Sequence, residues 1–197
     1  MIKTYSILKN GNVKLSKDFS VKEFACKNGA DTILIDTQLV EILQRIRDHF
    51  GKSVTINSAY RTPSYNASVG GVRNSQHTKG TASDIVVNGV NPMEVAQYAE
   101  YLMPTSGGIG LYKTFTHIDV RPTRARWKNY GREIAVVGFG GYSEPKKSKY
   151  ISVTDAISVL NKKGIISDTE KWYGGTWSDD DFKWLLRKVG TYIADKM

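Results

Sequence analysis

The chain contains 197 residues, of which 40% are hydrophobic and 24% are charged, a composition typical of a folded globular protein. This length suffices for one domain with a hydrophobic core and a small appendage, and it excludes two large domains. No stretch approaches the roughly 18 uninterrupted apolar residues that a transmembrane helix requires, so we expect no membrane span. The polar start of the chain, residues 1–19, also predicts no secretory signal peptide.

The formal net charge is +9, and the basic excess lies before residue 150, because residues 150–197 contain equal numbers of basic and acidic side chains. A basic body favours a polyanionic partner such as nucleic acid, an anionic cell wall or a membrane surface. Cys26 is the only cysteine, which excludes an internal disulfide and a cysteine-based zinc knuckle. The fold therefore depends on its core or on a metal with other ligands, and Cys26 is interpreted as a small hydrophobic residue.

The first third of the chain predicts two helices and a strand. Residues 20–23 have the pattern of a capping box that opens a short helix. Asp36 is placed to cap the next helix, in which apolar residues recur at helical spacing until Gly51. Residues 54–58 predict a short strand. The long polar stretch that follows, residues 59–81, is typical of a functional loop inside a compact domain.

The following region predicts one helix and four strands. The helix begins at Asn91, which is followed by a proline at the first helical position, and it runs to about Met103. The four strands are expected over residues 82–87, 107–111, 115–120 and 133–139. Residues 138–149 are rich in Gly, Pro and Lys and predict a linker, after which residues 150–197 predict a small module with two helices.

Two of the three histidines, His77 and His117, lie in segments that suit metal ligands. On its expected strand, Asp84 would be a carboxylate among apolar residues, and burying it is costly unless a cation or several donors compensate. Gly80 lets the preceding loop turn back toward Asp84, and His117 on a second strand can supply another nitrogen. Two imidazoles and one carboxylate with an open fourth position are typical of a catalytic zinc site. On spacing alone, a hydrogen-bonded histidine pair beside a surface aspartate is an equal alternative.

The segments SAYRTPSYNASVGGVRNSQHTKGTASDIVV and GGIGLYKTFTHIDVRP resemble the M15 family of zinc peptidases. These are the D-alanyl-D-alanine carboxypeptidase-like and L-alanyl-D-glutamate endopeptidase-like enzymes of cell-wall metabolism and phage lysins. The resemblance runs from about Leu15 to Trp127, and its core is Ser-x-His-x6-Asp followed by His-x-Asp on a strand. It implies an α+β fold with a small antiparallel sheet and flanking helices, shared with the hedgehog signalling domain.

The zinc ligands implied by the resemblance are His77, Asp84 and His117. The resemblance also implies that Arg61 faces the site and contacts substrate, since a guanidinium suits bidentate recognition of the carboxylates of wall peptides. Further substrate contacts are expected from Ser75, Gln76 and Tyr112. For the first two of these, ordinary loop polarity is the alternative interpretation.

The chain departs from the family pattern at one position. Many members carry an acidic general base three residues before the last zinc histidine, and Thr114 stands there in this chain. The nearby candidate base is Asp119, because it lies two residues beyond that histidine and shares its face of the strand. In one alternative, Asp119 orients Arg61 or a metal ligand through a hydrogen bond without contacting the metal. In another, it forms a salt bridge with Arg121 or Arg124.

Two further features of the sequence are not expected to belong to the candidate site. The run 121–132 mixes five basic residues with Trp127 and Tyr130. We interpret it as a solvated basic face or a surface attracted to anionic wall polymer, and we expect no specific nucleic-acid partner. His49 is expected at an exposed position of its helix.

These inferences favour a zinc metallopeptidase that cleaves bacterial peptidoglycan stem peptides, as a carboxypeptidase or an endopeptidase. The expected organisation is a catalytic domain over 1–137, a linker over 138–149 and a helical module over 150–197 that targets the wall or mediates self-association. The absent signal peptide, the basic body and this module together resemble a phage endolysin, made in the host cytoplasm and released to the wall through a holin pore. The alternative, favoured by Thr114, is a non-catalytic zinc-containing cell-wall-binding module of the same fold.

Overall fold

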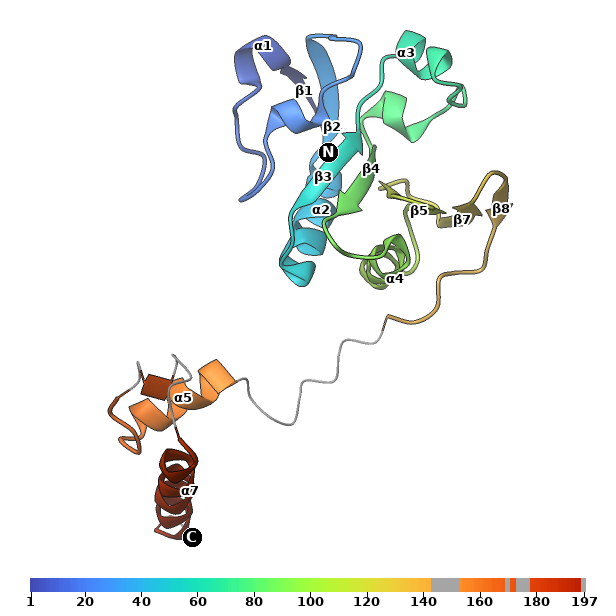
Figure 1. Ribbon diagram of the computed structural model, residues 1–197. Helices are drawn as coiled ribbons and strands as arrows, with labels where there is room; N and C mark the ends of the chain where they lie inside the picture. Colours follow the sequence, from blue (N-terminus) through green and yellow to red (C-terminus); the bar gives the residue numbers. More distant parts are fainter. Residues whose placement is uncertain (143–152, 169–170, 173–177, 196–197) are drawn as a thin grey trace. The chain divides into compact units, whose positions relative to one another are not determined.

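The computed structural model describes residues 1–142, 153–168, 171–172 and 178–195, which fall into two compact units, 1–142 and 143–197 (Figure 1). The first unit combines helices with two sheets, which confirms the expected α+β class. One of these is the small antiparallel sheet formed by β1 (Ile2–Ser6) and β2 (Thr32–Asp36). The other sheet is larger and mixed.

The larger sheet has six strands in the order β3-β4-β6-β5-β7-β8. The strands are β3 (Val54–Ser58), β4 (Ala82–Val87), β5 (Gly108–Tyr112), β6 (Thr116–Asp119), β7 (Ala125–Asn129) and β8 (Glu133–Ala135). Neighbouring strands are antiparallel except β5 and β7, which run parallel. This sheet is the frame on which the candidate site is built.

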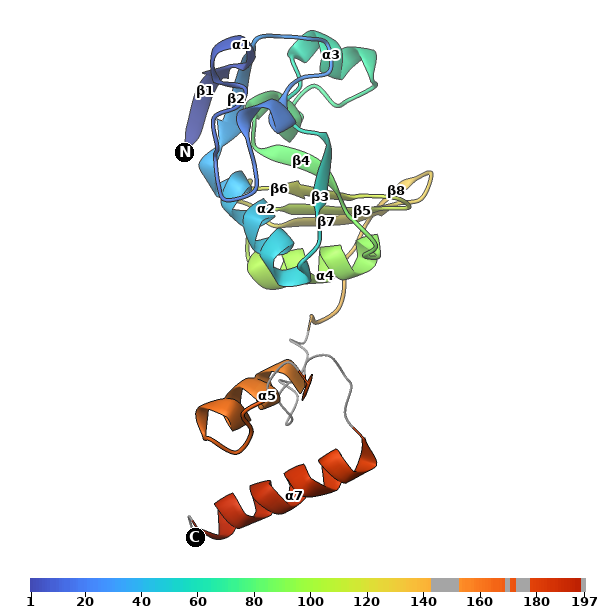
Figure 2. The ribbon, with the colours of Figure 1, turned by 60° about the vertical axis from the view of Figure 1, so that its left-hand side comes forward.

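Two amphipathic helices, α2 (Thr37–Phe50) and α4 (Pro92–Leu102), cover one face of this sheet, as Figure 2 shows. Asp36 caps α2 by accepting the N–H of Gln38, and Gly51 ends it with a positive φ of 60°, both as the sequence predicted. Apolar residues of both helices and of the sheet form one buried core, which includes Leu39, Leu43, Ile46, Ile85, Val95, Ala99, Ile109, Leu111 and Ile118.

Because side chains alternate along a strand, the opposite face of the sheet carries a different set of residues. Ile85 and Ile118 point into the core, so Asp84 and His117 belong to the other face. Short connecting elements lie in the segments before and between the strands: α1 (Ile7–Asn10), η1 (Val21–Phe24), α3 (Pro63–Ser68) and η2 (Gln76–Lys79). The polar stretch 59–81 thus contains two short helices within its loops.

Three sequence expectations differ from the structure. The basic run contains β7, and the side chain of Arg126 is fully buried, donating to backbone carbonyls and pairing with Glu100, so this part is no solvated face. The last strand ends at Ala135, and the core instead receives Phe139. The exposed position predicted for His49 is also wrong, because its ring is half-buried and stacks on a tyrosine ring with centroids 3.7 Å apart.

The second unit is helical in its described residues, with α5 (Val153–Lys162) and α7 (Asp179–Ala194). Ser178 and Asp181 form a capping box at the start of α7. A small core holds the unit together, formed by Ile157, Ile165, Ile166 and Trp172. Most of the expected linker, residues 143–149, lies outside the described residues. No helix in the described part of the chain is long and apolar enough to cross a membrane.

Candidate metal centre

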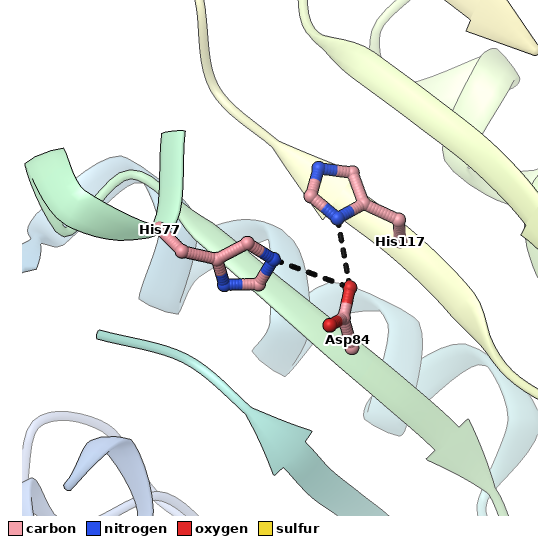
Figure 3. Close-up of side chains that lie close together, drawn as sticks. All are labelled: His77, Asp84 and His117. Carbon is pink, nitrogen blue, oxygen red and sulfur yellow. Dashed lines mark hydrogen bonds and ion pairs between the residues drawn. The ribbon is translucent and has the colours of Figure 1, made fainter. Parts of the chain in front are cut away.

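Three side chains from three elements converge beside β4, as Figure 3 shows: His77, Asp84 and His117. Asp84 and His117 lie directly opposite each other on the antiparallel strands β4 and β6, which places both side chains on the same face. His77 lies on η2, which ends at Gly80. Gly80 has a φ of 72° and lies so close to the carbonyl of Leu34 that a Cβ would not fit, so only glycine permits this turn.

One potential ligand atom from each residue lies within 4.8 Å of the other two. The Oδ1 atom of Asp84 is 3.3 Å from Nε2 of His77 and 2.8 Å from Nδ1 of His117. All three side chains are buried, with exposed fractions of 5%, 11% and 9%. Within the described residues this is the only group of three or more His, Cys, Asp or Glu side chains close enough to share a metal ion.

Each imidazole is oriented by a second hydrogen bond. Nδ1 of His77 lies 2.7 Å from the carbonyl oxygen of Ala59, which can only accept, so Nδ1 carries a proton and Nε2 faces the centre, where it can bind a metal ion in its unprotonated form. Nε2 of His117 lies 3.2 Å from Oδ2 of Asp119, which leaves Nδ1 directed at Asp84. An oxygen or carboxylate that fixes the tautomer in this way is the usual support of a metal-bound histidine. The donor set therefore fits a divalent metal such as zinc.

The pKa values of the metal-binding group are shifted because two imidazoles surround one carboxylate. Burial alone would raise the pKa of Asp84, but hydrogen bonds from His117 and His77 hold it far below the ordinary value. Burial would lower the pKa of His117, yet the carboxylates of Asp119 and Asp84 raise it to about 9. Without a metal ion, a proton on His117 thus adds positive charge beside the two carboxylates, which Arg61 and Arg121 also contact, and a metal ion can take the place of this proton.

Arg61 contacts the metal-binding group directly. Its Nη2 donates to Oδ2 of Asp84 at 2.7 Å, and its Nε donates to the hydroxyl of Ser58 at 2.8 Å. Its backbone N–H also donates to the carbonyl of His77. Arg61 therefore faces the site, with its guanidinium on the Asp84 oxygen that the histidines leave free.

Asp119 is fully buried and its carboxylate is saturated with donors. It accepts the backbone N–H groups of Gly108 and Arg121, the guanidinium of Arg121, and Nε2 of His117. Burial would raise its pKa, but the hydrogen bonds from His117 and Arg121 hold it well below the ordinary value. The salt bridge with Arg121, one of the alternatives from the sequence, is present.

A cavity of about 710 Å³ opens beside the metal-binding group and includes His77, Asp84 and His117 in its wall. All four expected substrate contacts, Arg61, Ser75, Gln76 and Tyr112, also line it. Ser75 accepts the N–H of His77 and so caps η2, while the amide oxygen of Gln76 accepts the hydroxyl of Thr81. Tyr112 is half-buried and stacks on Phe115 with ring centroids 4.2 Å apart.

Strands β7 and β8 contribute cavity residues that the sequence did not assign to the site. Trp127 lies with its ring centroid 5.1 Å from that of His117, and its Nε1 donates to the hydroxyl of Tyr112 at 3.3 Å. The indole covers Gly110, where a Cβ would collide with it. Glu133 lines the far end of the cavity wall. The alternation of side chains along β7 was the only sequence signal that could have pointed to Trp127. It does not reveal that β7 pairs with β5, which is what brings Trp127 to the site.

Two comparisons with known proteins bear on this site. Residues 17–119 match the protein family described as Peptidase M15, a match that includes His77, Asp84 and His117. Over 104 residues the chain is 35% identical to the "Probable peptidoglycan L,D-endopeptidase MepK" of Haemophilus influenzae, covering 48% of this chain and 54% of that protein. The chain thus spans about half the length of this relative. Since the family match covers more than half of the chain and the three converging side chains could bind a metal ion, the chain belongs to the peptidase M15 family of metallopeptidases.

Proposed function

We propose that the chain is a zinc-dependent endopeptidase that cleaves peptide bonds in bacterial peptidoglycan stem peptides. One observation carries the proposal: two imidazole nitrogens and one carboxylate oxygen lie within 4.8 Å of one another in the wall of a cavity. Such a set of three protein ligands beside open space is typical of a catalytic zinc site. The name of the relative from Haemophilus influenzae, a probable peptidoglycan L,D-endopeptidase, supports peptidoglycan as the substrate and endopeptidase over carboxypeptidase action.

His77, Asp84 and His117 would hold the zinc ion. When bound, zinc supplies Lewis-acid chemistry, polarising a carbonyl and lowering the pKa of a water molecule toward neutrality. The protein's own contribution is to keep both imidazoles in the tautomer and orientation set by Ala59 and Asp119. Arg61 brings a permanent positive charge beside Asp84, where it can bind a substrate carboxylate or stabilise the oxyanion that forms at the scissile carbonyl.

We propose a positioning role for Asp119 and no direct proton transfer. A general base must present a lone pair to the water from which it removes a proton, and its pKa should lie near the working pH. Asp119 is fully buried, its pKa is held low, and its oxygens are already bonded to Arg121, Gly108 and His117. Its carboxylate therefore serves to orient His117 and to balance the charge of that imidazole.

The cellular setting is proposed from the sequence. A basic body with a separate helical unit suits an endolysin that is made in the host cytoplasm, reaches the wall through a holin pore and contacts anionic wall polymer. In this proposal, residues 150–197 direct the enzyme to the wall. A second candidate, a wall-binding protein of the same fold that holds zinc without turnover, is favoured by the saturated carboxylate of Asp119.

The test is to incubate the purified full chain with isolated bacterial cell walls and to measure new amino termini and the masses of released fragments. The wild type should release fragments, a chelator should stop the release, and zinc should restore it. Asp84→Asn should remove both zinc binding and release, whereas the exposed-site variant Asp48→Asn should change neither. Zinc binding without any new amino terminus would refute the peptidase and support the binding protein.

A further inference from the structure

The face of the sheet that carries the metal-binding group continues onto the last two strands. In the ladder, His117 lies opposite Gly110, Gly110 opposite Trp127, and Trp127 opposite Ala135. Two residues further along each strand, a second row on the same face consists of Tyr112, Asn129 and Glu133. All three members of this second row line the cavity.

Near the metal-binding group, the charged side chains of the cavity wall form ion pairs. At the other end of the cavity, one charged side chain has no such partner among the described residues. Each arginine of the wall is paired with a carboxylate, in the ion pairs Arg61–Asp84, Arg121–Asp119 and Arg126–Glu100. Glu133 is exposed, and its carboxylate forms no hydrogen bond or ion pair within the part of the chain that the structure describes. A solvated carboxylate therefore remains available at that end of the cavity.

We infer that Glu133 is a specificity-determining residue that recognises a primary ammonium group on a side chain of the substrate peptide. The inference rests on the proposed function and adds a chemical requirement to it. An alkyl ammonium has a pKa near 10.4 and stays protonated at neutral pH, so it is the peptide group whose charge complements Glu133. Such an exposed pair contributes little affinity but discriminates between substrates with and without the charge.

The position of Glu133 suits recognition and excludes direct participation in the reaction. Three strand spacings of about 4.8 Å separate β8 from β6, and Glu133 lies two residues, about 6.8 Å, further along the strands, so its backbone lies on the order of 16 Å from that of His117. An extended peptide advances about 3.4 Å per residue, so the backbone of a residue two or three positions from the scissile bond covers about 7–10 Å of this distance. A flexible side chain that ends in an ammonium group spans the remaining distance.

The experiment compares two synthetic stem peptides that differ only in the side-chain amine, which is free in one and acetylated in the other. Their binding to the zinc-loaded full chain is measured by calorimetry, and their cleavage by the appearance of new amino termini. The wild type should prefer the free amine about threefold to fivefold in binding and in kcat/KM. Glu133→Gln should remove the preference, and Glu133→Lys should reverse it in favour of the acetylated peptide.

The matched control is Glu94→Gln, because Glu94 is also exposed and lies on α4, which covers the opposite face of the sheet. This control should keep the wild-type preference. Equal binding of both peptides to the wild type, or the same preference in Glu133→Gln and in the wild type, would overturn the inference. Binding that discriminates without cleavage would support Glu133 as the recognition residue and refute the proposed peptidase, so the two failures are distinguishable.

Discussion

Replacing Asp119 with asparagine distinguishes two roles for this residue, a positioning role and that of a general base. The substitution keeps the shape of the side chain and removes its charge. One side of the new amide can still accept the backbone N–H groups of Gly108 and Arg121. Its NH₂ group then faces the guanidinium of Arg121 and Nε2 of His117, so donors meet donors where a carboxylate oxygen accepted both.

The magnitude follows from these lost contacts. A hydrogen bond to a charged group contributes about 1.5–3 kcal/mol, and the side chain of Arg121 is 27% exposed, so water takes over part of its loss. We therefore expect the metal-free protein to lose about 2 kcal/mol of unfolding free energy. Because the removed carboxylate orients His117, metal affinity should fall about 10- to 100-fold, and the cleavage rate of the metal-loaded protein should fall by no more than that factor.

The assay is competition with a chromogenic chelator for zinc, together with cleavage rates measured at saturating zinc and with chemical denaturation. Asp48→Asn provides the control, because it removes the same charge from an exposed position on α2. Unchanged zinc affinity combined with a rate loss of a thousandfold or more would refute the positioning role and restore Asp119 as the general base.

Three further predictions concern packing, buried charge and pH. In Gly110→Ala the new methyl group collides with the indole of Trp127, which should cost about 1–3 kcal/mol in thermal unfolding and lower kcat/KM on wall peptides; unchanged values would contradict this packing. Arg126→Met removes one of the two arginines that pair with Glu100 and the donor that Arg126 supplies to the buried carbonyls of Met103 and Gly107, so denaturant unfolding should show a loss of about 3–5 kcal/mol, against about 2–5 kcal/mol for the cavity left by Leu43→Ala. Burial alone would raise the pKa of Glu100, but hydrogen bonds from a backbone N–H and two arginines hold it below the ordinary value. The stability that this ionised carboxylate contributes is therefore present above the ordinary glutamate pKa of about 4.3 and is lost as the pH falls further. Glu100→Gln should reduce this acid-induced loss of stability, measured as the unfolding free energy between about pH 5 and about pH 3.

The local elements of the site could be predicted from the sequence because their causes are local. Asp36 and Gly51 delimit α2, and Gly80 provides the turn that only glycine can make, so the order of helix, strand and loop follows from neighbouring residues. Alternation along β4 and β6 was enough to place Asp84 and His117 on defined strand faces.

The tertiary structure decided which strands are neighbours and therefore what surrounds the site. Pairing β5 with β7 in parallel brings Trp127 beside His117 and carries Glu133 to the end of the cavity, although no local pattern connects these residues. Strand pairing depends on contacts between residues far apart in the sequence, and periodicity alone does not encode it. For the same reason the sequence left the role of Asp119 open, because only the folded protein places Gly108 and Arg121 around its carboxylate.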